Sequence, residues 1–373
     1  MTSTSTGAEH ATGDGGPAAA GRDGGLLSRA HAWLDARYDL SAIESFARHK
    51  TVPVHRQSIW YYFGGVAVFF FVVQVLSGAL LLVYYRADID VAFESIQHLM
   101  SHVKFGWLVR SVHVWSANLM VLAVFVHMFS VFFMKTYRRP RELTWVSGVL
   151  LLVLVLGFGF SGYLLPWNEI SLFATKVGTD MVGAVPLIGT FALKLLRGSE
   201  AVTGATLSRF FALHIAILPA IFTLILAGHL LFIQRQGMSQ EHPGTRSMRF
   251  VPDFLLRELL LWLIVLDVLA VLAVTLPGEL GHKADLLASA PAGIKPEWYF
   301  LAMFETLKLI PAHVGPLEGE VVGIVGFGLL GIAWGALPFY DRSDRWWGSR
   351  WLRVVVVLGL VYALAMTVKG ILT

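Results

Sequence analysis

The sequence contains no cysteine. A chain without cysteine forms no disulfide, binds no iron–sulfur cluster through its own thiolates and attaches no haem covalently. Charged residues are also scarce, at 14% of 373 residues, whereas 56% are hydrophobic and the mean hydropathy is +0.65. A soluble domain of this size cannot bury that much apolar surface. The composition therefore predicts an all-α protein that crosses a membrane several times.

Other familiar signals are missing too. There is no nucleotide-binding loop, no zinc signature and no basic stripe that would bind nucleic acid. Residues 1–25 are rich in Ser, Thr, Gly and Ala and have no apolar core, which indicates a disordered tail and not a signal peptide. Residues 26–58 place apolar side chains at helical spacing among charges, which predicts an amphipathic helix on the membrane surface and a lead-in to the first span.

Seven apolar runs follow, each near the roughly 20 residues that cross the hydrocarbon core. They lie at about 59–85, 109–134, 144–165, 210–233, 255–276, 319–338 and 352–371. With the N-terminus in the cytoplasm and the C-terminus outside, cytoplasmic segments hold 18 of the 29 Lys and Arg residues. The positive-inside rule favours this orientation, in an inner membrane of the bacterial type.

Four histidines lie within these spans at matched spacing. His113 and His127 are 14 residues apart in the second span, and His214 and His229 are 15 apart in the fourth. Each pair is separated by about 21–22 Å and lies on roughly one helix face. The pattern predicts two iron sites, His113 with His214 near the outer surface and His127 with His229 near the cytoplasmic surface. Bis-histidine sites in a four-helix bundle favour two non-covalent b-type haems. Histidines satisfied by neighbouring hydroxyls or carbonyls are the alternative.

Two further patterns support haem. Gly64 and Gly78 in the first span, and Gly148 and Gly162 in the third, are also 14 residues apart, as expected if a macrocycle needs neighbours without side chains at two depths. Close helix packing is the other use of such glycines. Two basic residues, Arg110 and Arg209, shortly precede the outer histidines, and we interpret them as partners of haem propionates in preference to residues that reach the membrane interface.

Several motifs make the chain resemble cytochrome b of the bc-type quinol oxidoreductases, which pass electrons to cytochrome c or plastocyanin. They are FGWLVRSVHVWSA (105–117), RRPRELTWVSG (138–148), GYLLPW (162–167), LSRFFALH (207–214) and KPEWYF (295–300). The 15-residue histidine step and the seven spans resemble the chloroplast-type branch, with its four-helix cytochrome (here 59–234) fused to its three-helix partner subunit (235–373). That branch holds a third haem through a cysteine where this sequence has Tyr62, so we expect no covalent third haem.

The resemblance implies that the chain oxidises a lipid quinol at the outer face. One electron goes to a Rieske-type iron–sulfur protein and on to a c-type cytochrome subunit, and the other crosses both haems to a quinone near the cytoplasmic face. This chemistry contributes to proton translocation, and it implies a dimeric complex in contact with membrane lipids. Quinol oxidation releases protons, and Glu297 is our candidate base, with Tyr299 as a hydrogen-bond partner. The resemblance places Tyr163 in another wall of the same site.

The cytoplasmic quinone site is less clear from the sequence. Arg56, Arg249, Asp253 and Glu258 are candidates there, although we prefer to interpret most of them as a basic rim that faces phospholipid. Arg246 occupies the position that we match to an aspartate of mitochondrial relatives. An Arg-rich inner side also predicts a higher midpoint potential for the inner haem.

Two alternatives remain open at this stage. A di-haem membrane anchor of a quinone-reactive dehydrogenase also has paired histidines, but it should lack the PEWYF loop and the last three helices. A proton-coupled transporter is the more distant alternative, with Asp267 inside the fifth span as part of a relay.

The histidine spacing and the absence of cysteine predict two extractable b haems per chain. A pyridine haemochrome assay should give two, and acid-acetone should remove both. Replacing His113 or His214 should remove the outer haem, and replacing His127 or His229 the inner one. Loss of the opposite haem would mean that the pairing is wrong.

Overall fold

The computed structural model describes residues 25–54, 58–239, 246–341 and 346–373. The predicted disordered tail lies outside these ranges except for Gly25. Within them, six helices are long and apolar enough to cross a membrane, and a seventh apolar helix is shorter. The six are Ile59–Leu82, Gly106–Phe133, Glu142–Leu164, Gly204–Gln236, Phe250–Thr275 and Arg350–Leu372, and the seventh is Gly319–Gly335. The predicted all-α, multi-pass fold is confirmed.

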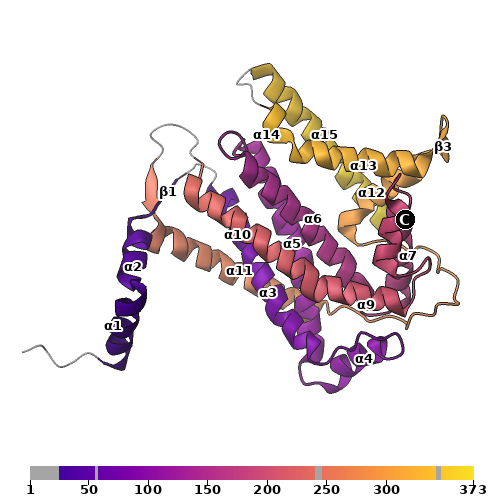
Figure 1. Ribbon diagram of the computed structural model, residues 1–373, viewed down its shortest axis with the longest axis horizontal. Helices are drawn as coiled ribbons and strands as arrows, with labels where there is room; N and C mark the ends of the chain where they lie inside the picture. Colours follow the sequence, from indigo (N-terminus) through magenta and orange to yellow (C-terminus); the bar gives the residue numbers. More distant parts are fainter. Residues whose placement is uncertain (1–24, 55–57, 240–245, 342–345) are drawn as a thin grey trace, which may run out of the picture.

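Four of these helices form the central bundle in Figure 1: α3 (Phe63–Leu82), α5 (Gly106–Phe133), α6 (Glu142–Leu164) and α10 (Leu218–Gln236). α3 packs along α5, and α6 packs along α10. Their shared core is apolar and consists of Val66, Phe70, Met120, Val121, Ala123, Leu151, Val155 and Phe222, with Leu269 from α11 (Leu255–Thr275). Both histidine-bearing helices thus have a glycine-bearing helix beside them.

The fourth span is not a plain α-helix. It begins with α9 (Gly204–Ala212), continues as a π-helical turn, η2 (Leu213–Ile217), and then becomes α10. Pro219 follows the π turn and has no N–H to donate, so the regular hydrogen-bond ladder is interrupted there. A π turn holds about one more residue than an α turn. It thereby absorbs the extra residue of the 15-residue step and brings His214 and His229 closer to one face than a straight helix would.

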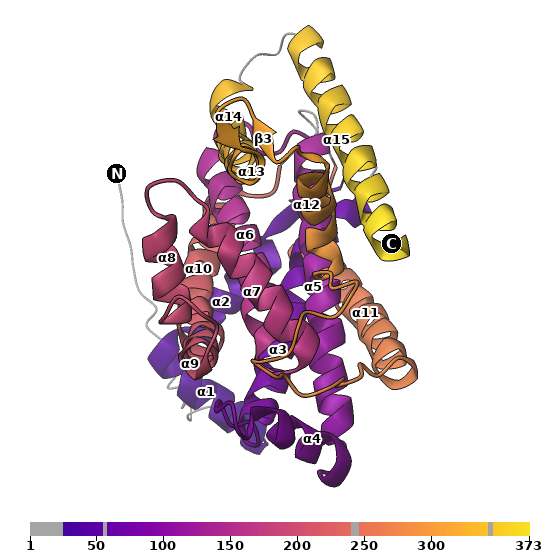
Figure 2. The same ribbon diagram turned by 90° about the vertical axis from the view of Figure 1, so that its right-hand side faces the viewer.

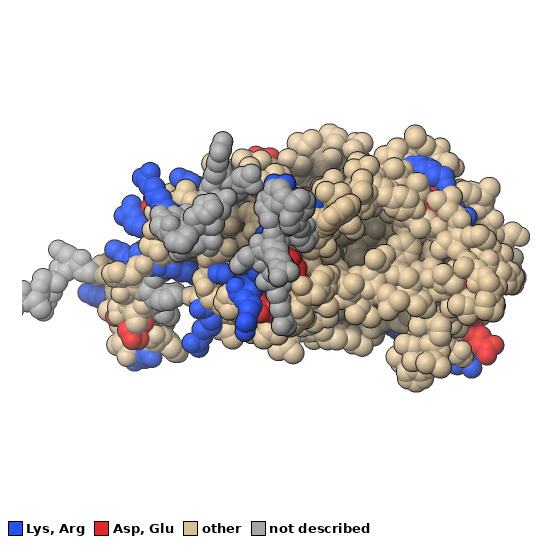
Figure 3. Space-filling model, turned by 90° about the horizontal axis from the view of Figure 1, so that it is seen from above, with Lys and Arg blue, Asp and Glu red and all other residues tan. Residues whose placement is uncertain are grey.

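The two ends of the bundle differ. The loop face, shown in Figure 2, is covered by α4 (Ala92–His102), α7 (Glu169–Gly183), α8 (Gly189–Arg197) and the segment 276–297. The basic face is the opposite end, with α1 (Leu26–Tyr38), α2 (Leu40–His49), the ends of α5 and α10, and the starts of α6 and α11. Lys and Arg gather towards this end in Figure 3.

The helices on the loop face were not predicted, because each is too short to form a membrane span. α7 begins at a capping box in which Asn168 and Ser171 bond reciprocally. Arg197 at the end of α8 is buried, and it donates to Thr179 at 2.6 Å and to Asp180 at 2.8 Å, both on α7. Polar side chains therefore hold these helices to each other above the bundle.

The predicted amphipathic segment forms two helices and not one. Asp39 adopts the left-handed conformation (φ 49°) and ends α1, and its carboxylate then bonds to Ser41 and to the backbone of Ala42 in α2. Aspartate tolerates this conformation better than most residues do. The chain then forms β1 (Thr51–Pro53), which pairs antiparallel with β2 (Ser247–Arg249), and the 3₁₀ turn η1 (Ser58–Tyr62) leads into α3. A π-helical turn, η3 (Phe250–Phe254), leads into α11.

The C-terminal part lies along one side of the bundle in Figure 1. It consists of α12 (Trp298–Leu309), the two-stranded β3 (His313–Val314) and β4 (Leu317–Glu318), α13 (Gly319–Gly335), α14 (Leu337–Tyr340) and α15 (Trp346–Leu372). Buried Glu305 of α12 accepts from Lys308 at 2.6 Å and pairs with Lys369 of α15 at 3.0 Å. These pairs lower the pKa of the Glu305 carboxyl.

A buried polar contact joins this part to the bundle near the basic face. Asp341 accepts a bidentate bond from Arg138, with the closest N–O distance 2.8 Å, and a short hydrogen bond from the Tyr137 hydroxyl. Burial and the carboxylate raise the pKa of Tyr137, so its hydroxyl stays protonated and donates.

Replacing Asp341 by Asn should destabilise the folded protein by about 3 kcal/mol, because it removes the buried carboxylate that pairs with the partly buried Arg138 guanidinium and accepts from Tyr137. The matched control is Glu142→Gln, which removes a 3.6 Å pair with Arg139 that is mostly exposed on the arginine side and should cost under about 1 kcal/mol. Thermal unfolding in detergent measures both. Equal melting temperatures for the two variants would contradict this assignment.

Candidate haem-binding and quinol sites

The four histidines meet in the predicted pairs. The ring centres of His113 and His214 are 6.4 Å apart, with planes at 69°. A metal bound to one nitrogen of each ring at about 2 Å would place two ring centres about 6 Å apart. His127 lies close enough to His229 for their charges to interact, nearer the basic face. α5 and the α9–α10 span thus present two imidazole pairs at two depths.

Serines orient three of the four rings. Ser77, Ser161 and Ser147 lie 2.9, 3.0 and 2.9 Å from the Nδ1 atoms of His113, His214 and His229. Each serine hydroxyl donates its own hydrogen to a carbonyl of its helix, those of Val73, Phe158 and Thr144. With that hydrogen on the carbonyl, the serine oxygen can accept from the ring, an arrangement that puts the ring hydrogen on Nδ1. The Nε2 lone pair is left free, which is the tautomer that binds a metal.

The four spaced glycines lie against the four rings, one to each. A Cβ on Gly162 would be 2.6 Å from the Cε1 atom of His214, and a Cβ on Gly64 would be 3.0 Å from that of His127. Gly78 and Gly148 stand in the same relation to His113 and His229, at 3.3 Å. The glycines were expected to make room for a macrocycle. In the structure they give the imidazole rings the space to lie beside the neighbouring helix.

These features fit b-type haem. The serine contacts suit the metal-binding tautomer of three rings, and the His113–His214 pair has the spacing of a bis-imidazole complex. Among the described residues no cluster of three or more His, Asp or Glu side chains offers a different metal site. His113 and His214 would hold one haem iron, and His127 and His229 the other.

The two arginines that we assigned to propionates have backbone partners. Buried Arg110 donates to the carbonyls of Gly278 and Glu279, at 2.5 and 3.2 Å, and so anchors the segment 276–297 to α5. Arg209 donates to the carbonyls of Lys194 and Leu195 at the end of α8. Their role towards propionates stays a prediction.

A cavity of about 1040 Å³ opens on the loop face, at the end of the bundle that holds His113 and His214. Its lining includes all three predicted quinol-site residues, Tyr163 from α6 and Glu297 and Tyr299 from the start of α12. The rest of the wall is mainly apolar and comes from α6, α7, the segment 276–297, α12 and α13. A Cβ on Gly159 would overlap with the Tyr299 hydroxyl, and one turn along α6 Gly162 abuts His214. The same helix therefore brings the cavity and the histidine together.

The cavity changes the chemistry of its acid. Burial raises the pKa of the Glu297 carboxyl. Burial also raises the pKa of Tyr299, and the charges of Glu297 and Tyr163 add to the effect. Trp298, between them, donates to Asn118 of α5 at 2.7 Å and so fixes the start of α12 against the bundle. The result is a positioned carboxyl that takes up a proton more readily than one in water.

The opposite end of the bundle has its own buried acid, Glu258 of α11. Its Oε1 accepts from the Trp262 indole at 3.0 Å. A Cβ on Gly65 would overlap with this carboxylate, whereas the preceding Gly64 abuts His127. Tyr62 is buried here too, with its ring stacked on Phe254 at 4.9 Å.

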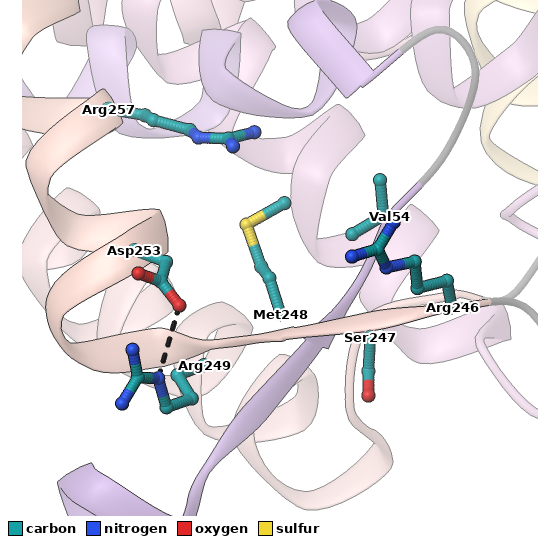
Figure 4. Close-up of a pocket in the computed structure, with 7 residues that line it drawn as sticks. All are labelled: Val54, Arg246, Ser247, Met248, Arg249, Asp253 and Arg257. Atoms are coloured by element: carbon teal, nitrogen blue, oxygen red, sulfur yellow. Dashed lines mark hydrogen bonds and ion pairs between the residues drawn. The ribbon is translucent and has the colours of Figure 1, made fainter.

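A second, basic cavity of about 430 Å³ lies close by, between the β1–β2 ribbon and the start of α11 (Figure 4). It is lined by Val54, Arg246, Ser247, Met248, Arg249, Asp253 and Arg257. Arg249 donates to Asp253 at 3.2 Å, which offsets one of the three positive charges. Arg56, another candidate for this region, lies outside the described residues. Asp267 is exposed on α11, away from both sites.

Comparison with known proteins places the chain in a family. Residues 48–237 match the model of cytochrome b/b6/petB, and residues 283–372 match that of cytochrome b(C-terminal)/b6/petD. The chain is 48% identical to the cytochrome bc complex cytochrome b subunit of Chlorobaculum thiosulfatiphilum, over 83% of this chain and 73% of that one. The chain belongs to the cytochrome b family.

Two further relatives agree. Cytochrome b6 of Euglena gracilis is 41% identical over 57% of this chain and 99% of its own length. The solved structure of a hyperthermophilic respiratory Complex III superimposes with a TM-score of 0.80 and 30% identity, covering 91% of this chain and 90% of that one. The predicted resemblance and function, the cytochrome b subunit of a bc-type complex, are confirmed. Because the PEWYF region belongs to the family match, the dehydrogenase anchor and the transporter are not supported.

The sequence did not lead us to predict the role of the serines of this cytochrome b, and it did not distinguish Glu258 from the other candidates near the cytoplasmic quinone site. Ser77, Ser147 and Ser161 each directly precede one of the spaced glycines, so a repeated Ser-Gly pair was visible in the sequence. Its meaning required knowing that the glycine touches a histidine. Glu258 looked like any acid at a helix start, and only its burial distinguishes it.

Gly162→Ala should displace the His214 ring and lower haem content from two to one per chain. Gly157→Ala on the same helix is the control, since its Cβ would meet only Leu218 at an ordinary 3.9 Å. The pyridine haemochrome assay reads both. Two haems retained in Gly162→Ala would show that the ring tolerates the methyl group.

Proposed function

We propose that this cytochrome b subunit oxidises a lipid quinol in the cavity on the loop face, and that its complex delivers electrons to a c-type cytochrome. The placement of Tyr163, Glu297 and Tyr299 in one cavity beside the outer histidine pair carries this proposal. The cavity is large and mainly apolar, as a quinol ring with an isoprenoid tail requires.

Glu297 is the proton acceptor in this proposal. Its raised pKa lets it take a proton from a quinol hydroxyl, and the helix start fixed by Trp298 holds it at the cavity wall. Tyr299, whose pKa is also raised, keeps its hydroxyl hydrogen and can orient the substrate. Tyr163 would close the site from α6.

Two b-type haems, when bound, carry single electrons across the membrane between the two quinone sites. His113 and His214 would hold the one near the cavity, and His127 and His229 the other. We expect no third, covalent haem, since the sequence has no cysteine and the ring of Tyr62 packs against Phe254 at the matching position.

Quinone reduction is assigned to the basic face, with Glu258 as a proton donor. It is a buried acid at that end, and the adjacent glycines Gly64 and Gly65 connect it to His127. The basic cavity of Figure 4 lies at the same end and would face anionic phospholipid headgroups. Protons taken up here and released at Glu297 would contribute to proton translocation.

The family and the charge distribution support the remaining assignments of this proposal. The partners are a Rieske-type iron–sulfur protein and a c-type cytochrome subunit, in a dimeric complex of a bacterial-type inner membrane. The basic face is cytoplasmic, which puts the N-terminus inside and the C-terminus outside. Residues 59–234 form the di-haem part, and 235–373 form the part that completes the quinol site.

Glu297→Gln should slow quinol oxidation by about 10²-fold, because the amide cannot take the proton. In the wild type the rate should rise with pH through a pKa above the usual 4.5 of a carboxyl, since only the ionised form accepts a proton. This part of the pH profile should vanish in the variant. Steady-state cytochrome c reduction by a quinol analogue measures both.

Haem content must stay at the wild-type level in Glu297→Gln for this comparison. Glu279→Gln is the matched control, since Glu279 is an exposed carboxylate in the same loop-face segment. Full activity of Glu297→Gln, or an equal loss in Glu279→Gln, would remove Glu297 from this role.

A further inference from the structure

The four ligand histidines differ in what their second ring nitrogen contacts. Nδ1 of His113, His214 and His229 bonds to a serine, at 2.9, 3.0 and 2.9 Å. Nδ1 of His127 is buried and has no hydrogen-bond partner among the described residues. The pair near the cavity therefore has two hydrogen-bonded rings, and the pair near the basic face has one.

A single side chain accounts for the difference. A shift of 14 residues along antiparallel α3 and α5, towards the basic face, carries His113 onto His127 and Gly78 onto Gly64. The same shift carries Ser77 onto Phe63, whose ring stacks on Trp60 at 5.9 Å and offers no acceptor. Ser130 lies near, but its hydroxyl donates to the His127 carbonyl at 2.7 Å and not to the ring.

Hydrogen bonding at Nδ1 changes the ligand. When the N–H donates to an oxygen, electron density at Nε2 increases and the ring becomes a more basic metal ligand. A more basic ligand stabilises ferric iron over ferrous iron and so lowers the midpoint potential. A ring without an acceptor does the opposite.

We propose that Ser77, Ser147 and Ser161 are positioning residues that set unequal potentials, and that Phe63 at the place of a fourth serine raises the potential of the haem held by His127 and His229. The proposal rests on the two bis-histidine haems of the proposed function. The serine pattern would act in addition to the positive charge of the Arg-rich loops, which also favours a higher potential for this haem. Part of that charge is neutralised, because Arg138 pairs with Asp341 and Arg139 with Glu142.

The test is a redox titration of both haems in the intact complex, followed optically and by the EPR g values of the ferric haems. Ser77→Ala is the best loss variant, because the carbonyls of Phe158 and Thr144 also contact the rings of His214 and His229. It should shift the redox equilibrium of the cavity-side haem about tenfold towards the reduced form. This corresponds to a rise of about 59 mV in its midpoint potential for one electron. Phe63→Ser should lower the potential of the other haem by a similar amount.

Two controls separate this role from general packing. Ser77→Thr keeps the hydroxyl and should keep the wild-type potentials. Ser111→Ala removes another buried hydroxyl of the same half, one that bonds to the Ala273 carbonyl and not to a histidine ring, and it should move neither potential.

The outcomes are distinct. Unchanged potentials in Ser77→Ala with both haems present would overturn the proposal, whatever Phe63→Ser does, as would a shift confined to the haem of His127 and His229. A wild-type complex without two b haems would instead overturn the proposed function on which this proposal depends.

Discussion

The structure depends on satisfying four imidazole rings inside an apolar bundle. A buried ring nitrogen without a partner is costly, since no water is present to replace the bond. Here one nitrogen of three rings meets a serine hydroxyl, and the other nitrogen is left for a metal. This requirement explains why α3 and α6 carry a glycine beside each ring, and in three cases a serine next to that glycine. The helices are placed to serve the rings, and the two quinone sites are built on the same helices.

Each end of the bundle combines a histidine, a glycine and an acid or phenol in a short distance. On α6, Gly162 touches His214 and Gly159 makes room for Tyr299. On α3, Gly64 touches His127 and Gly65 makes room for Glu258. Glycines thus allow Tyr299 and Glu258, the residues proposed to act on quinones, to lie close to the histidines proposed to bind haem. A site of this kind depends as much on the missing Cβ atoms as on the groups that react.

Much of this arrangement could be predicted from the sequence, because membrane spans and their histidines obey simple periodicities. The spans, the pairing of His113 with His214 and the location of Glu297 in an apolar setting all follow from spacing and neighbours. The short helices on the loop face could not be predicted, since α7 and α8 are held by Arg197 through tertiary contacts and not by a long apolar run. The π turn before Pro219 could not be predicted for another reason. In a regular α-helix, a step of 15 residues places the second histidine about 60° away from the face that carries the first. Only the local helix type shows how this offset is removed. The burial of Glu258 likewise depends on a neighbour, Gly65, that is nearly 200 positions away.

The contact of Arg138 and Tyr137 with Asp341 has a consequence for assembly. It joins the four-helix part to the helices that follow. Cytochrome b6 of Euglena gracilis aligns over 99% of its own length with only 57% of this chain. Where two such parts are separate polypeptides, an equivalent contact would form only at a rate set by their concentrations and could be lost on dilution. In one polypeptide the linked parts meet at a high effective concentration. Synthesis as one polypeptide also produces the two parts in equal numbers, so neither part accumulates in the membrane without the other.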